Sequence, residues 1–149
     1  MNVIGRRFAS RSALISPVVY LLDTNICSYF ISKRNPSVTQ KLREIDPKIV
    51  FISSIVSGEL AYGVAHSTRI ESNRANLELF LSNMQVLPWD EKAIWQFGFQ
   101  KSRLRKLGTP ISEIDLLLGC QALALDYIFV TNNTKEFERI EGLKLENWV

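Results

Sequence analysis

Histidine and cysteine are scarce in this 149-residue chain, which contains one His and two Cys. Cys27, Cys120 and His66 are too few for a disulfide framework or a four-ligand zinc site. No serine or cysteine motif surrounds His66, so a nucleophile–histidine pair has no support, and we expect this residue at the surface or at a helix end. Free thiols fit a reducing compartment, which favours a cytoplasmic protein.

The chain also lacks a glycine-rich phosphate loop, internal repeats and a long apolar run. The absence of the loop argues against a P-loop nucleotide site. The apolar stretches fall short of the roughly 20 residues that span a bilayer, so we expect no membrane association. With 46% hydrophobic and 22% charged residues, a chain of this length fits one soluble globular domain with a substantial core.

Acidic residues are missing from the first 17 positions, which contain Arg6, Arg7 and Arg11. This segment accounts for the formal net charge of +3, because residues 18–149 hold 15 basic and 15 acidic side chains. A basic pI is therefore weak evidence for nucleic-acid binding. We interpret residues 1–17 as a disordered extension, or as the product of a start codon assigned too far upstream. A transit peptide is the alternative, whereas Pro17 and the missing cleavage site argue against a secretory leader.

One local basic patch remains in the stretch "KSRLRKLG", where no acid is nearby in the sequence. A solvated helix face is one interpretation of this patch, and a set of phosphate contacts is the other. The candidate RNA contacts are Lys101, Arg103, Arg105 and Lys106. Four aromatic residues lie shortly before this stretch, and they could stack on bases. For Trp89, Trp95, Phe97 and Phe99, however, the helical spacing favours packing in the core.

Apolar strands and helices alternate along residues 18–149. The runs "VVYLLD", "KIVFIS", "VLPW" and "YIFVTNN" predict strands, and helices are predicted between them. Asn35 with Pro36, then Ser53 or Ser54, and Ser112 are expected to begin three of the helices. This alternation predicts a three-layer α/β/α sandwich with a central, mainly parallel sheet. Such sheets bind ligands beyond the carboxyl ends of their strands.

Three carboxylates lie where an apolar surface is expected. Asp23 ends the first strand, directly before Thr24 and Asn25. Glu59 lies on a mostly apolar helix face, and Asp115 shares a helical stripe with small residues that would let another element approach closely. A helix cap is an alternative for Asp115. Burying an unpaired carboxylate costs several kcal/mol, so three that point at one cleft require a cation. Hard oxygen ligands suit Mg²⁺ or Mn²⁺.

Four stretches in order resemble the signatures of the PIN domain, in particular the VapC-type toxins of type II toxin–antitoxin modules. They are "YLLDTN", "ISSIVSGELAYG", "GTPISEIDLLLGCQAL" and "FVTNNTKEFERIEGLKLENWV". The similarity runs from about Val19 to Val149, so we expect a PIN domain over residues 18–149. The resemblance implies a metal-dependent endoribonuclease, often dimeric, that cleaves structured RNA, either transfer RNA or ribosomal RNA. It also implies a cognate small antitoxin as the partner.

The family's three acids fall on Asp23, Glu59 and Asp115, which the resemblance makes the catalytic residues. Asp23 and Asp115 would bind Mg²⁺, with Mn²⁺ as a substitute. Where many relatives have a further Asp, this chain has Asn133, with Glu136 three residues later, which puts a second metal in doubt. Thr131, Asn133 and Glu136 are the supporting residues: the Thr131 hydroxyl would fix a neighbouring carboxylate, and a strand-end cap is the alternative for Thr131. The implied reaction is attack on the phosphate by metal-activated water, which leaves a 5′-phosphate and a 3′-hydroxyl.

Two other functions remain open from the sequence. An aspartate-dependent phosphotransferase would use Asp23 as nucleophile, but such enzymes need a second Asp close behind the first, and "DTN" lacks it. A catalytically weak PIN-like binding module is the second alternative. The intact set of three acids argues against it, whereas Asn133 leaves it open.

Overall fold

A computed structural model describes residues 17–149, and it contains a single sheet of five parallel strands. Along the sheet the strands follow the order β3-β2-β1-β4-β5. They span Tyr20–Leu22 (β1), Val50–Ser53 (β2), Gln85–Leu87 (β3), Ile128–Val130 (β4) and Leu145–Glu146 (β5). The predicted parallel α/β fold is confirmed, and β5 adds one strand to the four that were predicted.

Seven α-helices connect and follow these strands in the described residues. They span Thr24–Ser32 (α2), Pro36–Glu44 (α3), Ser54–Ala65 (α4), Ile70–Ser82 (α5), Ile94–Lys106 (α6), Glu113–Leu125 (α7) and Thr134–Phe137 (α8). Short 3₁₀ turns, η1 (Pro47–Ile49) and η2 (Glu91–Ala93), precede β2 and α6. Asn35, Ser53 and Ser112 cap α3, α4 and α7 through their side chains, as predicted.

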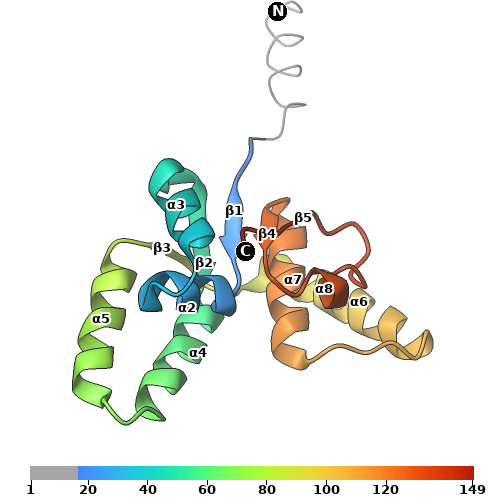
Figure 1. Ribbon diagram of the computed structural model, residues 1–149. Coiled ribbons are helices and arrows are strands. Elements are labelled where there is room, and N and C mark those ends of the chain that lie inside the picture. Colours follow the sequence, from blue (N-terminus) through green and yellow to red (C-terminus); the bar gives the residue numbers. More distant parts are fainter. Residues whose placement is uncertain (1–16) are drawn as a thin grey trace, which may run out of the picture.

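The helices form two layers because the chain changes direction within the sheet. From β1 it passes outward to β2 and β3, and it then crosses to the other side of β1 to form β4 and β5. Right-handed crossovers in opposite directions place their helices on opposite faces. Accordingly, α2 packs with α3, α4 and α5, whereas α6 packs with α7. Figure 1 shows these two groups on opposite sides of the sheet, which confirms the three-layer arrangement.

The core lies between the sheet and the two helical layers. The central strands β1 and β4 are buried on both faces, so Leu21, Leu22 and Phe129 are fully inaccessible to solvent, as is typical of a parallel sheet. A Cβ atom on Gly119 would lie 2.3 Å from Cδ1 of Ile140. The close approach of another element to α7, predicted from its small residues, is therefore present.

The predicted core position of the α6 aromatics is wrong for two of them. Trp89 and Phe97 are half-buried and form an edge-to-face pair, but Trp95 and Phe99 are 70% and 68% exposed. Helix α6 is an outer helix, and it buries only the face that carries Gln100 and Leu104. Trp95 and Phe99 lie on the face that turns away from α7.

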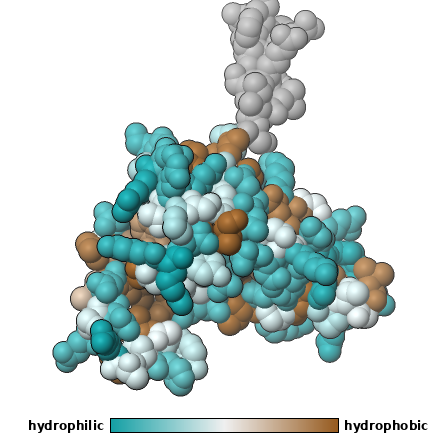
Figure 2. All heavy atoms as spheres, in the orientation of Figure 1, coloured by the Kyte–Doolittle hydropathy of each residue, from teal (hydrophilic) through white to brown (hydrophobic). Residues whose placement is uncertain are grey.

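Over residues 17–149, no helix combines the length and the apolar character needed to cross a membrane. The face of the molecule seen in Figure 2 is largely hydrophilic, and its apolar atoms form separate patches. The predicted extension at residues 1–17 lies outside the described part of the chain, apart from Pro17.

Candidate active site

Asp23 lies at the carboxyl end of β1 and is held on three sides. Its backbone N–H donates to the carbonyl oxygen of Val130 at 2.8 Å, which extends the pairing between β1 and β4 by one residue. Its Oδ1 accepts a hydrogen bond from the backbone N–H of Thr24, and its Oδ2 accepts one from the hydroxyl of Thr131, both at 2.8 Å. The side chain is only 5% exposed, so its orientation is well defined.

The position of Asp23 follows from the strand order. The connections that leave β1 and β4 pass to opposite sides of the sheet, and this leaves a crevice at their carboxyl ends where parallel sheets bind ligands. Asp23 follows β1, and Thr131 follows β4. The Thr131–Asp23 hydrogen bond therefore joins the two strand ends across this crevice.

Glu59 reaches the same region from the second turn of α4. One of its oxygens, Oε1, accepts a hydrogen bond from the hydroxyl of Thr24 at 2.6 Å. Thr24 thus contacts two of the predicted acids, Asp23 through its backbone and Glu59 through its side chain. Sequence reasoning assigned no role to Thr24, although its place directly after a strand-end carboxylate was a signal.

Asp115 lies in the first turn of α7, where its backbone N–H donates to the Oγ of Ser112. Its pKa is raised to about 6, mainly because the carboxyl group is partly buried. The charges of Glu136, Asp23 and Glu59 raise it further, while the Ser112 hydroxyl opposes the shift. The three predicted acids therefore share one electrostatic environment, although their helices lie in different layers.

Glu136 is the fourth acid of the site. The side-chain amide of Asn133 donates a hydrogen bond to Oε2 of Glu136, and the backbone N–H of Asn133 donates to the Thr131 hydroxyl at 3.0 Å. Asn133 thus orients the carboxylate three residues later, and Thr131 connects this segment to Asp23. All three predicted supporting residues lie at the site.

The charges that act on the central carboxylates are all negative. Burial is the main reason that the pKa of Asp23 is raised, and the nearby charges of Glu59 and Glu136 add to the effect. The hydrogen bonds from Thr131 and Thr24 favour the ionised form and oppose this rise. Clustered carboxylates that raise each other's pKa attract a cation.

A divalent cation is compatible with the chemistry of these donors, because carboxylate oxygens are ligands that Mg²⁺ prefers. The side chains do not form a ready ligand cage, since no three Asp, Glu, His or Cys side chains within residues 17–149 are grouped to hold one ion. Mg²⁺ keeps several water ligands and needs only one or two protein carboxylates. The donor set therefore fits a cation held by few direct contacts.

The basic patch is partly neutralised by the fold. Lys101 forms an ion pair with Glu113 at the start of α7, and Arg103 lies 3.6 Å from a carboxylate oxygen of Glu141. No acid lies near these two residues in the sequence, but α7 and the segment after α8 bring acids to α6 in the fold. Arg105 is exposed. The assignment of Lys101, Arg103, Arg105 and Lys106 as RNA contacts stays a prediction.

The cysteine thiols and the histidine ring do not contribute to the chemistry of the site. Cys27 and Cys120 are free and buried, and burial raises the pKa of both thiols. Neither side chain is therefore available as a thiolate nucleophile. His66 is exposed at the end of α4, as predicted, and its ring stacks on Tyr62.

Comparison with known proteins gives consistent matches over this fold. The family model described as "PIN domain" matches residues 20–143. Ribonuclease VapC2 of Rickettsia felis is 40% identical over 132 residues, which is 88% of this chain and 98% of that protein. The tRNA(fMet)-specific endonuclease VapC of Shigella flexneri is 37% identical over 129 residues, which is 87% of this chain and 97% of that protein.

Solved structures agree with the sequence matches. The crystal structure of VapBC2 from Rickettsia felis bound to a DNA fragment from its promoter contains a similar chain, with a TM-score of 0.82 and 39% identity. That match covers 89% of this chain and all of the other. The DNA-bound VapBC of Salmonella typhimurium gives a TM-score of 0.83 at 33% identity, again over 89% of this chain and all of the other.

Proposed function

Because the chain belongs to the PIN domain family, we propose that it is the ribonuclease toxin of a toxin–antitoxin module. One observation carries the proposal: Asp23, fixed between two strand ends, shares its electrostatic environment with Glu59, Asp115 and Glu136. The relatives at 37–40% identity are named ribonucleases or endonucleases. An acidic crevice of this kind suits metal-assisted cleavage of a phosphodiester.

The cofactor that this proposal includes is Mg²⁺, for which Mn²⁺ would substitute. Asp23 and Asp115 would hold the cation directly, and Glu59 would complete or support the set. When bound, the cation supplies positive charge that offsets the charge of the phosphate and increases the acidity of water at the site.

The remaining residues hold the carboxylates in place. The Thr131 hydroxyl fixes one oxygen of Asp23, and the Thr24 hydroxyl fixes one oxygen of Glu59. In the metal-free protein the pKa of Asp115 is about 6, so below neutral pH a proton competes with the cation for this carboxylate. With limiting Mg²⁺, cleavage should therefore increase between pH 5 and pH 7.

We propose structured RNA as the substrate, with transfer RNA ahead of ribosomal RNA. The relative from Shigella flexneri is named a tRNA(fMet)-specific endonuclease, and this supports transfer RNA as the first class to test. Attack by water requires no 2′-hydroxyl, so the products should carry a 5′-phosphate and a 3′-hydroxyl.

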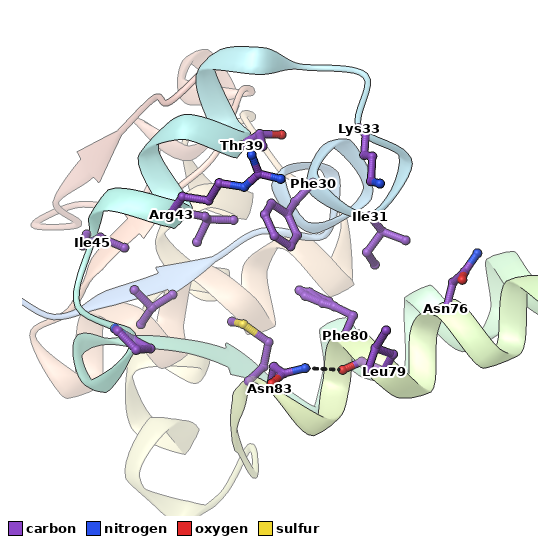
Figure 3. Close-up of a pocket in the computed structure, with 14 residues that line it drawn as sticks. Phe30, Ile31, Lys33, Thr39, Arg43, Ile45, Asn76, Leu79, Phe80 and Asn83 are labelled. Carbon is purple, nitrogen blue, oxygen red and sulfur yellow. Dashed lines mark hydrogen bonds between the residues drawn. The ribbon is translucent and has the colours of Figure 1, made fainter.

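The partner in this proposal is a small antitoxin, because the two similar solved structures are VapBC assemblies. A groove of about 530 Å³ between α2, α3 and α5 is a suitable place for it. Phe30 and Phe80 line the groove and pack against each other, with ring centroids 5.9 Å apart, and Arg43 extends over it (Figure 3). Its wall includes Leu79, which is 66% exposed.

The groove favours an amphipathic segment with acidic residues. Apolar side chains of the partner would pack on Phe30 and Leu79, while Lys33 and Arg43 at the groove would pair with carboxylates. Because α2 begins directly after Asp23, a chain that leaves the groove along α2 approaches the acidic site. An Arg on that chain would pair with two carboxylate oxygens there and take the place of the metal.

The test uses the purified full chain with transfer RNA and ribosomal RNA, with Mg²⁺ or Mn²⁺ and then with excess chelator. Cleavage should require the metal and should be lost in Asp115→Asn, while Glu113→Gln in the same helical turn should keep most of it. Sequencing the RNA ends should identify 5′-phosphates. Undiminished cleavage in chelator, or 2′,3′-cyclic phosphate ends, would contradict the mechanism.

A further inference from the structure

Tyr62 and His66 form an exposed pair of stacked rings on α4. Tyr62 is 70% exposed, and His66 is exposed at the end of the helix. The ring centroids lie 5.7 Å apart, and the angle between the ring planes is 10°. His66 covers one face of the Tyr62 ring, and the exposure of Tyr62 leaves the other face open. A single exposed aromatic residue is ordinary, but two parallel rings present a flat, preformed surface.

The ring pair continues a face of α4 that begins at the acidic site. Ile55, Glu59, Tyr62 and His66 are spaced by three or four positions, so their side chains leave the helix on one side. Glu59 accepts the hydrogen bond from the Thr24 hydroxyl at 2.6 Å, which places this part of the face at the site. With a rise of about 1.5 Å per residue, Tyr62 lies about 4–5 Å beyond Glu59 along the helix axis. The flat surface is therefore one helical turn from a carboxylate of the site.

Two glycines border this face and leave open space beside it. A Cβ atom on Gly58 or Gly63 would meet nothing within 4 Å, so no contact within the described chain requires glycine at either position. Glycine inside a helix costs about 0.5–1 kcal/mol relative to alanine. Gly58 directly precedes Glu59, and Gly63 directly follows Tyr62. The space next to the carboxylate and the exposed ring allows the backbone of another molecule to approach closely.

We propose that Tyr62 and His66 form a stacking platform for a base of the RNA substrate, next to the phosphate that is cleaved. Proteins bind unpaired RNA bases by stacking them on aromatic side chains, and every base has a face that can stack. Successive nucleotides of a strand are about 3.4 Å apart along its axis, which is comparable with the distance along α4 from Glu59 to Tyr62. A phosphate at the acidic site therefore places a neighbouring base at the ring. The platform deepens the proposed ribonuclease function and rests on it.

RNA fits this face better than a protein partner does. Glu59 is the one acid in α4, and it belongs to the site, where a bound cation would offset its charge. Beyond the ring pair, Arg69 is exposed and forms no ion pair within residues 17–149, so it is available to a phosphate of the same strand. The apolar groove that suits an antitoxin lies elsewhere, between α2, α3 and α5. Flat rings that continue from the acidic site to an unpaired cation favour a nucleotide.

The first test compares kcat/KM for cleavage of transfer RNA by variants of the full chain. Tyr62→Ala should lower kcat/KM about tenfold or more, because loss of a stacking ring weakens the binding of a base to that extent. Tyr62→Phe should retain most of the activity, whereas Tyr62→Leu should lose as much as Tyr62→Ala, because a flat ring and not apolar bulk is needed. His66→Ala should lower kcat/KM about threefold, because it removes only the support of the Tyr62 ring. Circular dichroism would show that each variant is folded.

Trp95→Ala is the matched control, since Trp95 is also 70% exposed but lies on α6, in the other helical layer. It should leave cleavage unchanged. If Tyr62→Ala cleaves as well as the parent, the platform is wrong and the proposed ribonuclease function stands. If Tyr62→Leu restores the cleavage lost in Tyr62→Ala, the contact is apolar, and stacking is overturned. A parent that cuts neither transfer RNA nor ribosomal RNA contradicts the proposed function itself, and the platform fails with it.

Fluorescence tests the stacking directly. The probe is a transfer RNA stem-loop that the parent cuts, with 2-aminopurine placed in turn at each nucleotide beside the mapped cleavage site. The emission of this base falls when it stacks on a ring. All proteins carry Asp115→Asn, which keeps the RNA intact. Emission at one of these positions should fall on binding, and adding Tyr62→Ala should abolish the change, whereas adding Trp95→Ala should not.

Two results of these measurements would overturn the platform. The first is the same loss of emission with and without Tyr62→Ala, because the base would then stack elsewhere. The second is a Tyr62→Ala variant that handles RNA normally but binds the co-expressed antitoxin, or a second copy of the chain, less tightly. The exposed ring would then belong to that protein contact, and the assignment to RNA would be wrong.

Discussion

Replacing Asp115 by Asn should raise the stability of the metal-free protein at neutral pH, although it removes activity. The folded protein raises the pKa of Asp115 from 3.8 to about 6. Between these values the folded state binds more protons than the unfolded state, so the free energy of unfolding falls as pH increases. The penalty is small near pH 4 and nearly complete above pH 7. Asn carries no charge and avoids it.

The gain in the free energy of unfolding follows from the rise of the pKa from 3.8 to about 6, which corresponds to about 3 kcal/mol before solvent screening is considered. Solvent screens a group that is only partly buried, and this reduces the figure to about 1–2 kcal/mol. Asn also loses a favourable interaction with the N-terminus of α7, which is worth about 0.3–1 kcal/mol. A net gain of about 1 kcal/mol should raise Tm by about 3 °C for a domain of this size.

The assay is thermal unfolding of parent and variant in chelator at pH 4, 5.5 and 7. The difference in Tm should be small or slightly unfavourable at pH 4 and should turn in favour of the variant at pH 7. Glu113→Gln is the control, because it removes an exposed acid from the same helical turn and should not stabilise. With excess Mg²⁺ the parent should gain stability and the variant should gain little. If Asp115→Asn lowers Tm at pH 7 without metal, Asp115 is a structural residue and the charge argument is wrong.

Three further changes test other parts of the structure. Thr131→Val removes the hydroxyl that contacts Asp23 and Asn133. Denaturant unfolding should show that the free energy of unfolding falls by about 1–2 kcal/mol, and RNA cleavage should also fall. Thr131→Ser should keep both the stability and the cleavage. Gly119→Ala places a methyl group against Ile140 and should cost about 1–3 kcal/mol in the same measurement, whereas Gly63→Ala, where a Cβ meets nothing within 4 Å, should not destabilise the protein. Leu79→Ser and Arg43→Glu should each weaken binding of the co-expressed antitoxin about tenfold or more in calorimetry, with Trp95→Ser as the unaffected control; equal losses in all three would contradict the groove assignment.

The fold could be predicted from the sequence because its central strands, β1, β2 and β4, are largely buried. A near-continuous apolar run such as Tyr20–Leu22 has few alternatives to a parallel strand, and the caps at Asn35 and Ser112 mark helix starts directly. Strand β5 could not be predicted in the same way. It has only two residues, Leu145 and Glu146, and it exists because the backbone pairs with β4.

The exposure of Trp95 and Phe99 shows what helical periodicity leaves undecided. Spacing identifies which residues share a face, but it does not say whether another element covers that face. Helix α6 carries apolar side chains on two faces, and α7 covers only one of these faces. The ion pair between Lys101 and Glu113 could likewise not be predicted from the sequence, because it depends on how α6 and α7 pack.

The way that the site obtains its fourth carboxylate shows how local geometry compensates for a residue difference. Asn133 follows the β4 strand end, where it adds no charge, and α8 begins at the next residue. Residues three apart on a helical turn lie on the same side, so Glu136 returns toward Asn133, and the amide binds its carboxylate. The longer Glu side chain reaches close enough to raise the pKa of both Asp23 and Asp115. The site thus has four negative groups although the strand end itself carries an amide, and Asn133 acts by positioning one of them.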